Sequence, residues 1–130
     1  MLVAADVDGS VDSDPATFGS LLAALRAAGH HVAILTGSST AHPTAQDCAD
    51  KVAYLKALGC GACWDTLVVF PNPPAVAKAQ WCRANGVALL LDNDLANAKA
   101  AAPYTTVLVP FNSADPPKGL KRKFRPEGPP

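Results

Sequence analysis

The sequence predicts an α/β domain in which helices cover both faces of a five-stranded parallel sheet, a doubly wound, Rossmann-like three-layer sandwich. Short apolar runs closed by turn residues alternate five times with segments whose apolar residues recur at helical spacing. The 130 residues are 49% hydrophobic, which is enough for a single core. These observations favour one compact unit rather than two domains.

Each expected strand is a short apolar run that a polar or turn-forming residue closes. The first begins at Leu2 and runs into Asp6, where two carboxylates and Gly9 end it. The expected strands span residues 2–6, 31–36, 67–70, 87–91 and 105–109. Their apolar character on both faces is typical of buried parallel strands.

The expected helices lie between these runs and carry start and stop signals. Asp14 and Pro15 suit the start of the first helix, and Gly29 ends it. The helices are expected at residues 15–28, 43–58, 75–85 and 95–102. In the second helix, the expected core-facing residues are Ala45, Cys48, Ala49, Val52, Leu55 and Leu58.

Charge divides the chain into two parts although the formal net charge is zero. Residues 1–110 are acidic overall and hold the expected core, whereas residues 111–130 are basic and proline-rich. We expect the second part to be a tail that adds little to the core. Its basic residues give slight weight to nucleic-acid phosphates as a partner, although a solvated terminus is the commoner role.

Polar residues gather where the strands end. Asp6 and Asp8 follow the first strand, and their spacing predicts that both project to the same side. Thr36, Gly37 and Ser38 follow the second strand. The fourth strand runs into Asp92, Asn93 and Asp94, and Lys78 lies near the start of the third helix. Because parallel strands open on one edge, these groups predict a site for a hard cation and a phosphate.

In this order the motifs resemble those of the haloacid dehalogenase-like (HAD) phosphohydrolase superfamily. Its first motif, Asp-x-Asp-Gly-Thr or Ser, is similar to residues 6–10, and its second, a strand ending in Thr or Ser, is similar to residues 34–37. Lys78 matches the third motif in rough position, and residues 91–94 resemble the acidic fourth motif. The resemblance covers residues 1 to about 110.

The resemblance implies a Mg²⁺-dependent phosphatase that acts on a phosphomonoester. Asp6 would be the nucleophile that forms an aspartyl-phosphate, and Asp8 the general acid and base. Thr36 and Lys78, with the Gly37–Ser38 loop, would bind the phosphoryl group. Mg²⁺ would be bridged by Asp6, the carbonyl of Asp8 and a fourth-motif residue. That residue could be Asp92, Asn93 or Asp94, because Asn93 stands where the family usually has a carboxylate.

The intervals between these motifs leave no room for the cap domain that many family members carry. An open site suits a phosphate on a large substrate, or a lid from a partner chain in a homo-oligomer. The alternative is a binding or interaction domain that kept the fold while its fourth motif changed to Asn93.

Other features bear on environment and on further metals. No basic leader precedes the first strand, and no apolar run is long enough for a membrane helix, so we expect a cytoplasmic protein with no membrane partner. Four cysteines are then more typical of thiols than of disulfides. Cys60 and Cys63 could form half of a zinc site or a redox pair, with Cys48 and Cys82 completing four ligands. His42 is expected in an exposed loop.

Overall fold

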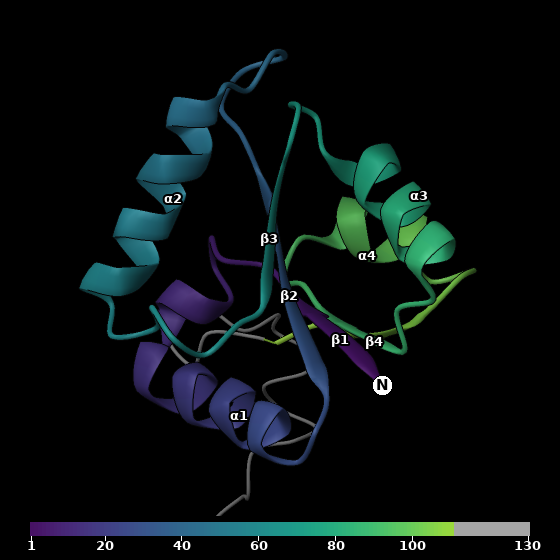
Figure 1. Ribbon diagram of the computed structural model, residues 1–130. Coiled ribbons are helices and arrows are strands. Elements are labelled where there is room, and N and C mark those ends of the chain that lie inside the picture. The colour runs from purple at the N-terminus through teal and green to yellow at the C-terminus, as the bar shows by residue number, and fades with distance from the viewer. Residues whose placement is uncertain (111–130) are drawn as a thin grey trace, which may run out of the picture.

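A computed structural model describes residues 1–110 of the 130-residue chain. Within these residues five parallel strands form one sheet in the order β3-β2-β1-β4-β5 (Figure 1). The strands are β1 (Leu2–Ala5), β2 (His31–Gly37), β3 (Thr66–Phe70), β4 (Leu89–Leu91) and β5 (Thr106–Leu108). Because the strand order reverses direction at β1, a crevice is expected beyond the carboxyl end of that strand.

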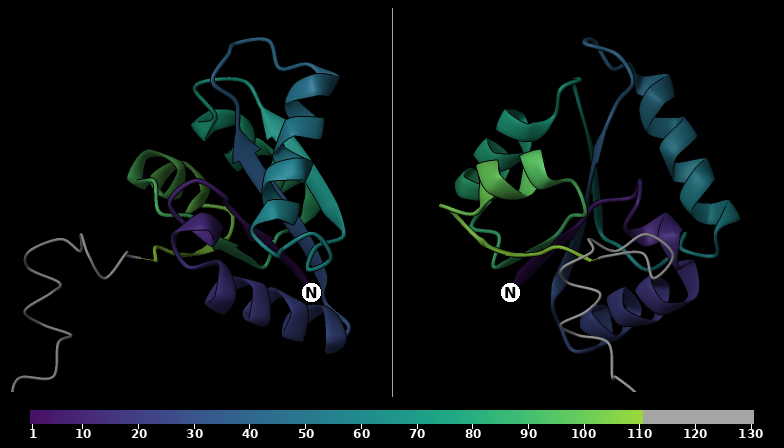
Figure 2. Two further views of the ribbon diagram at one scale, coloured as in Figure 1. Left: turned by 90° about the vertical axis from the view of Figure 1, so that its left-hand side faces the viewer. Right: turned by 180° about the vertical axis from the view of Figure 1, so that it is seen from behind.

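The helices lie on both faces of the sheet. A short 3-10 helix, η1 (Val11–Ser13), leads into α1 (Pro15–Ala27), and α2 (Ala45–Ala57) covers the same face. The other face is covered by α3 (Ala75–Asn85) and α4 (Leu95–Ala101), as the views in Figure 2 show. The predicted three-layer α/β fold is therefore confirmed, and residues 1–110 belong to this sandwich without a cap.

The core consists of two buried clusters, one on each face of the sheet. Alternate residues of the central strands supply each cluster: Ala5 and Ile34 face α1 and α2, whereas Ala4 and Leu35 face α3 and α4. This alternation is the period-2 geometry of a strand. The central strands are thus fixed on both sides, and their carboxyl ends form a rigid edge.

The register of the sheet aligns the ends of β1 and β4. Ala5 lies opposite both Ile34 and Leu91. The N–H of Asp6 then donates to the carbonyl of Leu91 at 2.8 Å, which holds the residues after the two strands side by side. The polar residues of both strand ends consequently share one edge.

The second helix differs from its predicted packing. Of the expected inward-facing residues only Leu55 is buried, and Val52 is exposed. The helix therefore rests on the sheet through few apolar side chains and turns a polar stripe toward the strand ends. No helix within residues 1–110 is long and apolar enough to cross a membrane. The predicted tail, residues 111–130, lies outside the described residues.

Candidate functional site

A cleft of about 630 Å³ opens at the carboxyl edge of the sheet, between α2 on one side and α3 and α4 on the other. Its volume is within the range of roughly 300–1,000 Å³ that small-molecule sites occupy. Most predicted site residues line it: Asp6, Asp8, Gly37, Ser38, Lys78, Asn93 and Asp94. The sequence thus located the cleft, although it did not give the partners of the side chains.

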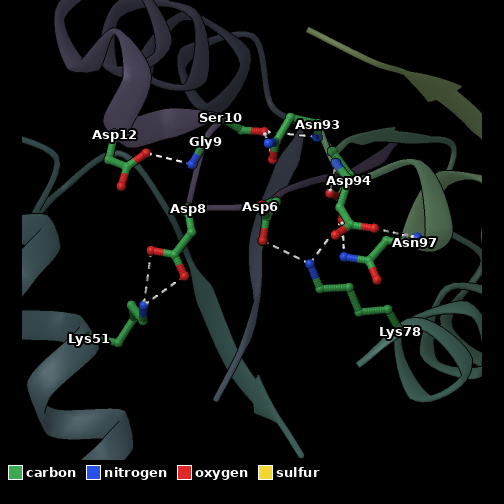
Figure 3. Close-up of polar contacts among 11 residues, drawn as sticks. Asp6, Asp8, Gly9, Ser10, Asp12, Lys51, Lys78, Asn93, Asp94 and Asn97 are labelled. Carbon is green, nitrogen blue, oxygen red and sulfur yellow. Dashed lines mark hydrogen bonds and ion pairs between the residues drawn. The ribbon is translucent and has the colours of Figure 1, made fainter. Parts of the chain in front are cut away.

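A buried ion cluster forms the wall of the cleft on the α3 side. The Nζ of Lys78 lies 2.8 Å from Oδ1 of Asp6 and 2.9 Å from Oδ2 of Asp92, as Figure 3 shows for the Lys78–Asp6 pair. The side chains of Lys78 and Asp92 are fully buried. Asn97 also donates to Asp92 at 3.2 Å. Such a cluster is rigid, because each charge depends on its partners in a region of low dielectric.

Burial is the largest single influence on the pKa values of Asp6 and Lys78. It raises the pKa of Asp6 to about 6, and although Lys78 opposes this, the charges of Asp92 and Asp8 add to it. Burial also disfavours the charged form of Lys78, but the carboxylates of Asp6 and Asp92 outweigh it, so the pKa of Lys78 is raised. The lysine therefore stays charged, while Asp6 can change protonation near neutral pH.

Asp6 and Asp8 both line the cleft, but their carboxylates pair with lysines on opposite walls of it. The Nζ of Lys51, on α2, lies 3.3 Å from Oδ2 of Asp8, and Figure 3 shows Asp8 paired with Lys51 and Asp6 paired with Lys78. β1 ends at Ala5 and residues 7–10 form a turn, so Asp8 projects from a turn rather than from the strand. Val7 is fully buried in this turn.

Asn93 lies where the two strand ends meet. We assign its side-chain amide with the nitrogen facing the first strand end, because Oδ1 at that position would face oxygen acceptors. The two N–H groups then face three oxygens, the carbonyl of Asp8 at 2.8 Å, Oδ2 of Asp6 at 3.2 Å and Oγ of Ser10 at 3.3 Å. Its backbone N–H also donates to Oγ of Ser10 at 3.2 Å. Gly9 makes room for this amide: its φ is +82°, and a Cβ there would collide with the Asn93 side chain.

The remaining carboxylates predicted to hold Mg²⁺ have other partners. Oδ1 of Asp92 accepts from the backbone N–H of Asp94, while its other oxygen binds Lys78 and Asn97. Oδ1 of Asp94 caps the N-terminus of α4. In residues 1–110, no three side chains of the His, Cys, Asp or Glu types are grouped to hold a metal. This donor set does not fit a Mg²⁺ ion, and Mg²⁺ stays a prediction without geometric support.

The end of β2 supplies the hydroxyls of the site. Thr36 is fully buried, and its Oγ1 has no hydrogen-bond partner within the described part of the chain. Gly37 and Ser38 line the cleft, and Ser39 is exposed beside them. An unpartnered buried hydroxyl next to a cleft is costly unless a ligand or water satisfies it.

Residues on α2 were missed by the sequence analysis. Asp47, Asp50, Lys51 and Tyr54 line the cleft, and their spacing of three and four residues places them on one helix face. Tyr54 donates to Oδ2 of Asp12 at 2.9 Å, and this hydrogen bond raises the pKa of the tyrosine. The helical spacing of these polar residues can be seen in the sequence, but the prediction for this helix used only its apolar residues.

The cysteines do not converge on a zinc site. Cys60 and Cys63 are buried in the cluster under α1 and α2, whereas Cys82 belongs to the cluster on the opposite face of the sheet. Burial also raises the pKa of Cys63 to about 11, which disfavours the thiolate that zinc requires. The pair is therefore part of the core. His42 is exposed, as predicted, and does not line the cleft.

Comparisons with known proteins support the fold but do not identify the chemistry of the site. No family model matches the sequence, and no curated protein matches it. Among solved structures, the fold is similar to that of a universal stress protein in complex with cAMP. The TM-score is 0.54 at 19% sequence identity, over 87% of this chain and 98% of the other. At this identity the likeness shows the shared α/β fold.

This comparison corrects the family and activity that the motifs implied. The structural neighbour is a universal stress protein rather than a HAD phosphohydrolase, so the HAD assignment and the phosphatase function with its aspartyl-phosphate are wrong. The motifs misled because each is only a few residues long. Any parallel sheet that gathers polar residues at its carboxyl edge can place Asp, Thr and Lys in such an order.

Proposed function

We propose that this chain is a nucleotide-binding protein whose ligand lies in the cleft between α2 and the strand ends. The observation that carries the proposal is the cleft itself, because it combines a volume suited to a ligand with the hydroxyls of Ser38 and Ser39 and an exposed aromatic side chain. The complex of a structurally similar universal stress protein with cAMP supports the same ligand class. The function is binding rather than hydrolysis.

The phosphate end of the ligand would lie where β2 and α3 meet the cleft. Of the four α-helices in residues 1–110, α3 alone lacks a side-chain cap, since it begins after Pro74. Its first N–H groups are therefore available, and Pro74 lines the cleft together with Ser38 and Ser39. Free N–H groups at a helix N-terminus and nearby hydroxyls are suited to phosphate oxygens.

The base end would lie on α2. Among the described residues, Tyr54 is the one aromatic side chain that lines the cleft, and it is 40% exposed. The Nζ of Lys51 lies 5.7 Å from the centre of its ring. A base stacked on Tyr54 would direct its phosphate across the cleft, toward the start of α3 and the hydroxyls of Ser38 and Ser39.

Calorimetric titration with adenine and guanine nucleotides, including cAMP, tests the proposal. We expect saturable binding of at least one nucleotide, and weaker binding of inorganic phosphate. Ser39→Asp places a carboxylate at the phosphate end and should weaken that binding at least tenfold. Ser20→Asp, which adds the same charge to an exposed position of α1, is the matched control. If none of the nucleotides binds, the proposed function fails.

The remaining predicted partners are part of this proposal or stay predictions. A cytoplasmic location agrees with the four free thiols and with a nucleotide ligand. Assembly into a homo-oligomer stays a prediction. Nucleic-acid contact through the basic tail also stays a prediction, because residues 111–130 lie outside the described residues.

A further inference from the structure

We propose that the Asn93 amide replaces a metal ion, so that the junction of the two strand ends holds itself together without a divalent cation. The junction gathers three oxygens around one point: Oδ2 of Asp6, the carbonyl of Asp8 and Oγ of Ser10. Oxygens that converge in this way need a positive group between them. The amide NH₂ of Asn93 supplies it, with donor–acceptor distances of 2.8–3.3 Å.

The opposite orientation of the Asn93 amide would change what the junction can bind. If Oδ1 of Asn93 faced the junction, it could accept from the hydroxyl of Ser10 at 3.3 Å, but it would also face the carbonyl of Asp8 and Oδ2 of Asp6. A cation among the four oxygens would relieve that repulsion. The same side-chain position therefore fits either an amide donor without a metal or an amide acceptor with one. The choice depends on how much negative charge the junction offers.

The available charge favours the amide donor. Asp6 is the one carboxylate at the junction, and its other oxygen is already paired with Lys78 at 2.8 Å. The side chain of Asp8 is turned to Lys51, and Asp92 is held by Lys78 and Asn97. A divalent ion would face a single, already neutralised carboxylate next to a buried ammonium group. Mg²⁺ sheds its water reluctantly and gains too little here.

The packing around the amide is also built for this side chain. Ser10 is fully buried and accepts from both the side chain and the backbone N–H of Asn93. Gly9 leaves the space that the amide fills, since a Cβ would collide with it. The amide is thus a fixed link between the β1 and β4 ends rather than a solvated group.

The inference is independent of nucleotide binding, because the metal alone is the probe. Titration of the wild-type chain with Mn²⁺, followed by paramagnetic broadening of amide signals, should give no saturable site at residues 6–10 and 93. Asn93→Asp replaces the donor by a second carboxylate and should create a saturable Mn²⁺ and Mg²⁺ site. Its Tm should rise with metal concentration. Asn72→Asp, which adds the same charge elsewhere in the cleft, should gain no such site.

A second measurement covers the case in which Asn93→Asp does not fold. In the wild-type chain, the side-chain NH₂ signals of Asn93 should exchange slowly with solvent and stay unchanged on adding EDTA or millimolar Mg²⁺. Saturable Mn²⁺ binding to the wild type at this junction would overturn the inference. So would a fast-exchanging NH₂ group, or a folded Asn93→Asp variant that gains no metal affinity.

Discussion

The ion pairs on the two walls of the cleft differ in how deeply they are buried. On the α3 side, Lys78 is fully buried between two carboxylates, whereas on the α2 side Lys51 pairs with Asp8, whose side chain is 63% exposed. The buried wall resists change because any broken contact leaves an uncompensated charge. The exposed wall exchanges its contacts with water at little cost. We therefore assign a structural role to the buried cluster around Lys78 and propose that the α2 wall makes adaptable contacts to the ligand.

The largest expected effect comes from removing the central lysine. Lys78→Met leaves Asp6 and Asp92 buried without their counter-charge and should lower the free energy of unfolding by about 3–5 kcal/mol at neutral pH. Lys51→Met, its counterpart on α2, should cost less than about 1 kcal/mol. Urea denaturation of both variants measures the difference. Equal losses would contradict the division between the two walls.

The pH dependence of stability should reveal Asp6. Its pKa in the folded protein is raised from 3.8 to about 6, so the folded state keeps this proton at pH values where the unfolded chain has lost it. The free energy of unfolding should therefore fall as pH rises from about 4 to about 6, by on the order of 3 kcal/mol. Asp6→Asn should flatten this slope, measured by urea denaturation across that range. If Asp8→Asn flattens it equally, Asp6 is not its source.

Two glycines allow the cost of crowding a Cβ to be measured separately from the cost of a left-handed backbone. Gly9 and Gly29 both have positive φ values, +82° and +93°, but only at Gly9 would a Cβ meet a neighbour. Gly29→Ala should cost about 1 kcal/mol for the left-handed backbone. Gly9→Ala should cost about 1–3 kcal/mol more, because the Asn93 amide must move. Thermal denaturation compares them, and similar losses would show that the junction is loosely packed.

The smallest expected effect concerns the adaptable wall. Tyr54→Leu removes the aromatic surface and should weaken nucleotide binding roughly tenfold, the loss of one stacked base. Tyr54→Phe keeps the ring and should bind nearly as the wild type does, although it loses the hydrogen bond to Asp12. Calorimetry on both variants tests this. Equal weakening in Tyr54→Phe and Tyr54→Leu would assign the effect to the hydroxyl instead.

Regular elements were predictable from the sequence because their signals are local. The helix of residues 15–28 has an N-cap aspartate, a proline and a terminal glycine, and α1 indeed spans Pro15–Ala27. Strand-end polar residues likewise located the cleft. The separate partners of Asp6 and Asp8 could not be predicted, because they depend on which helix brings a lysine to each carboxylate. The predictions of family and activity were wrong for a related reason. Short motifs indicate that polar residues lie at the edge of a sheet, but they do not determine the chemistry there.

The most direct test of the account is to map a bound nucleotide onto the backbone amides by NMR. The nucleotide with the highest affinity in calorimetry would be titrated into labelled full-length protein. Nucleotide binding across the cleft predicts shifts on both walls, at Ser38 and Ser39 and at Tyr54, that saturate together. It predicts no shifts in the second cavity, at the opposite edge of the sheet, which Arg26, His30 and Asp65 line. Shifts confined to that cavity, or no saturable shifts at all, would contradict it.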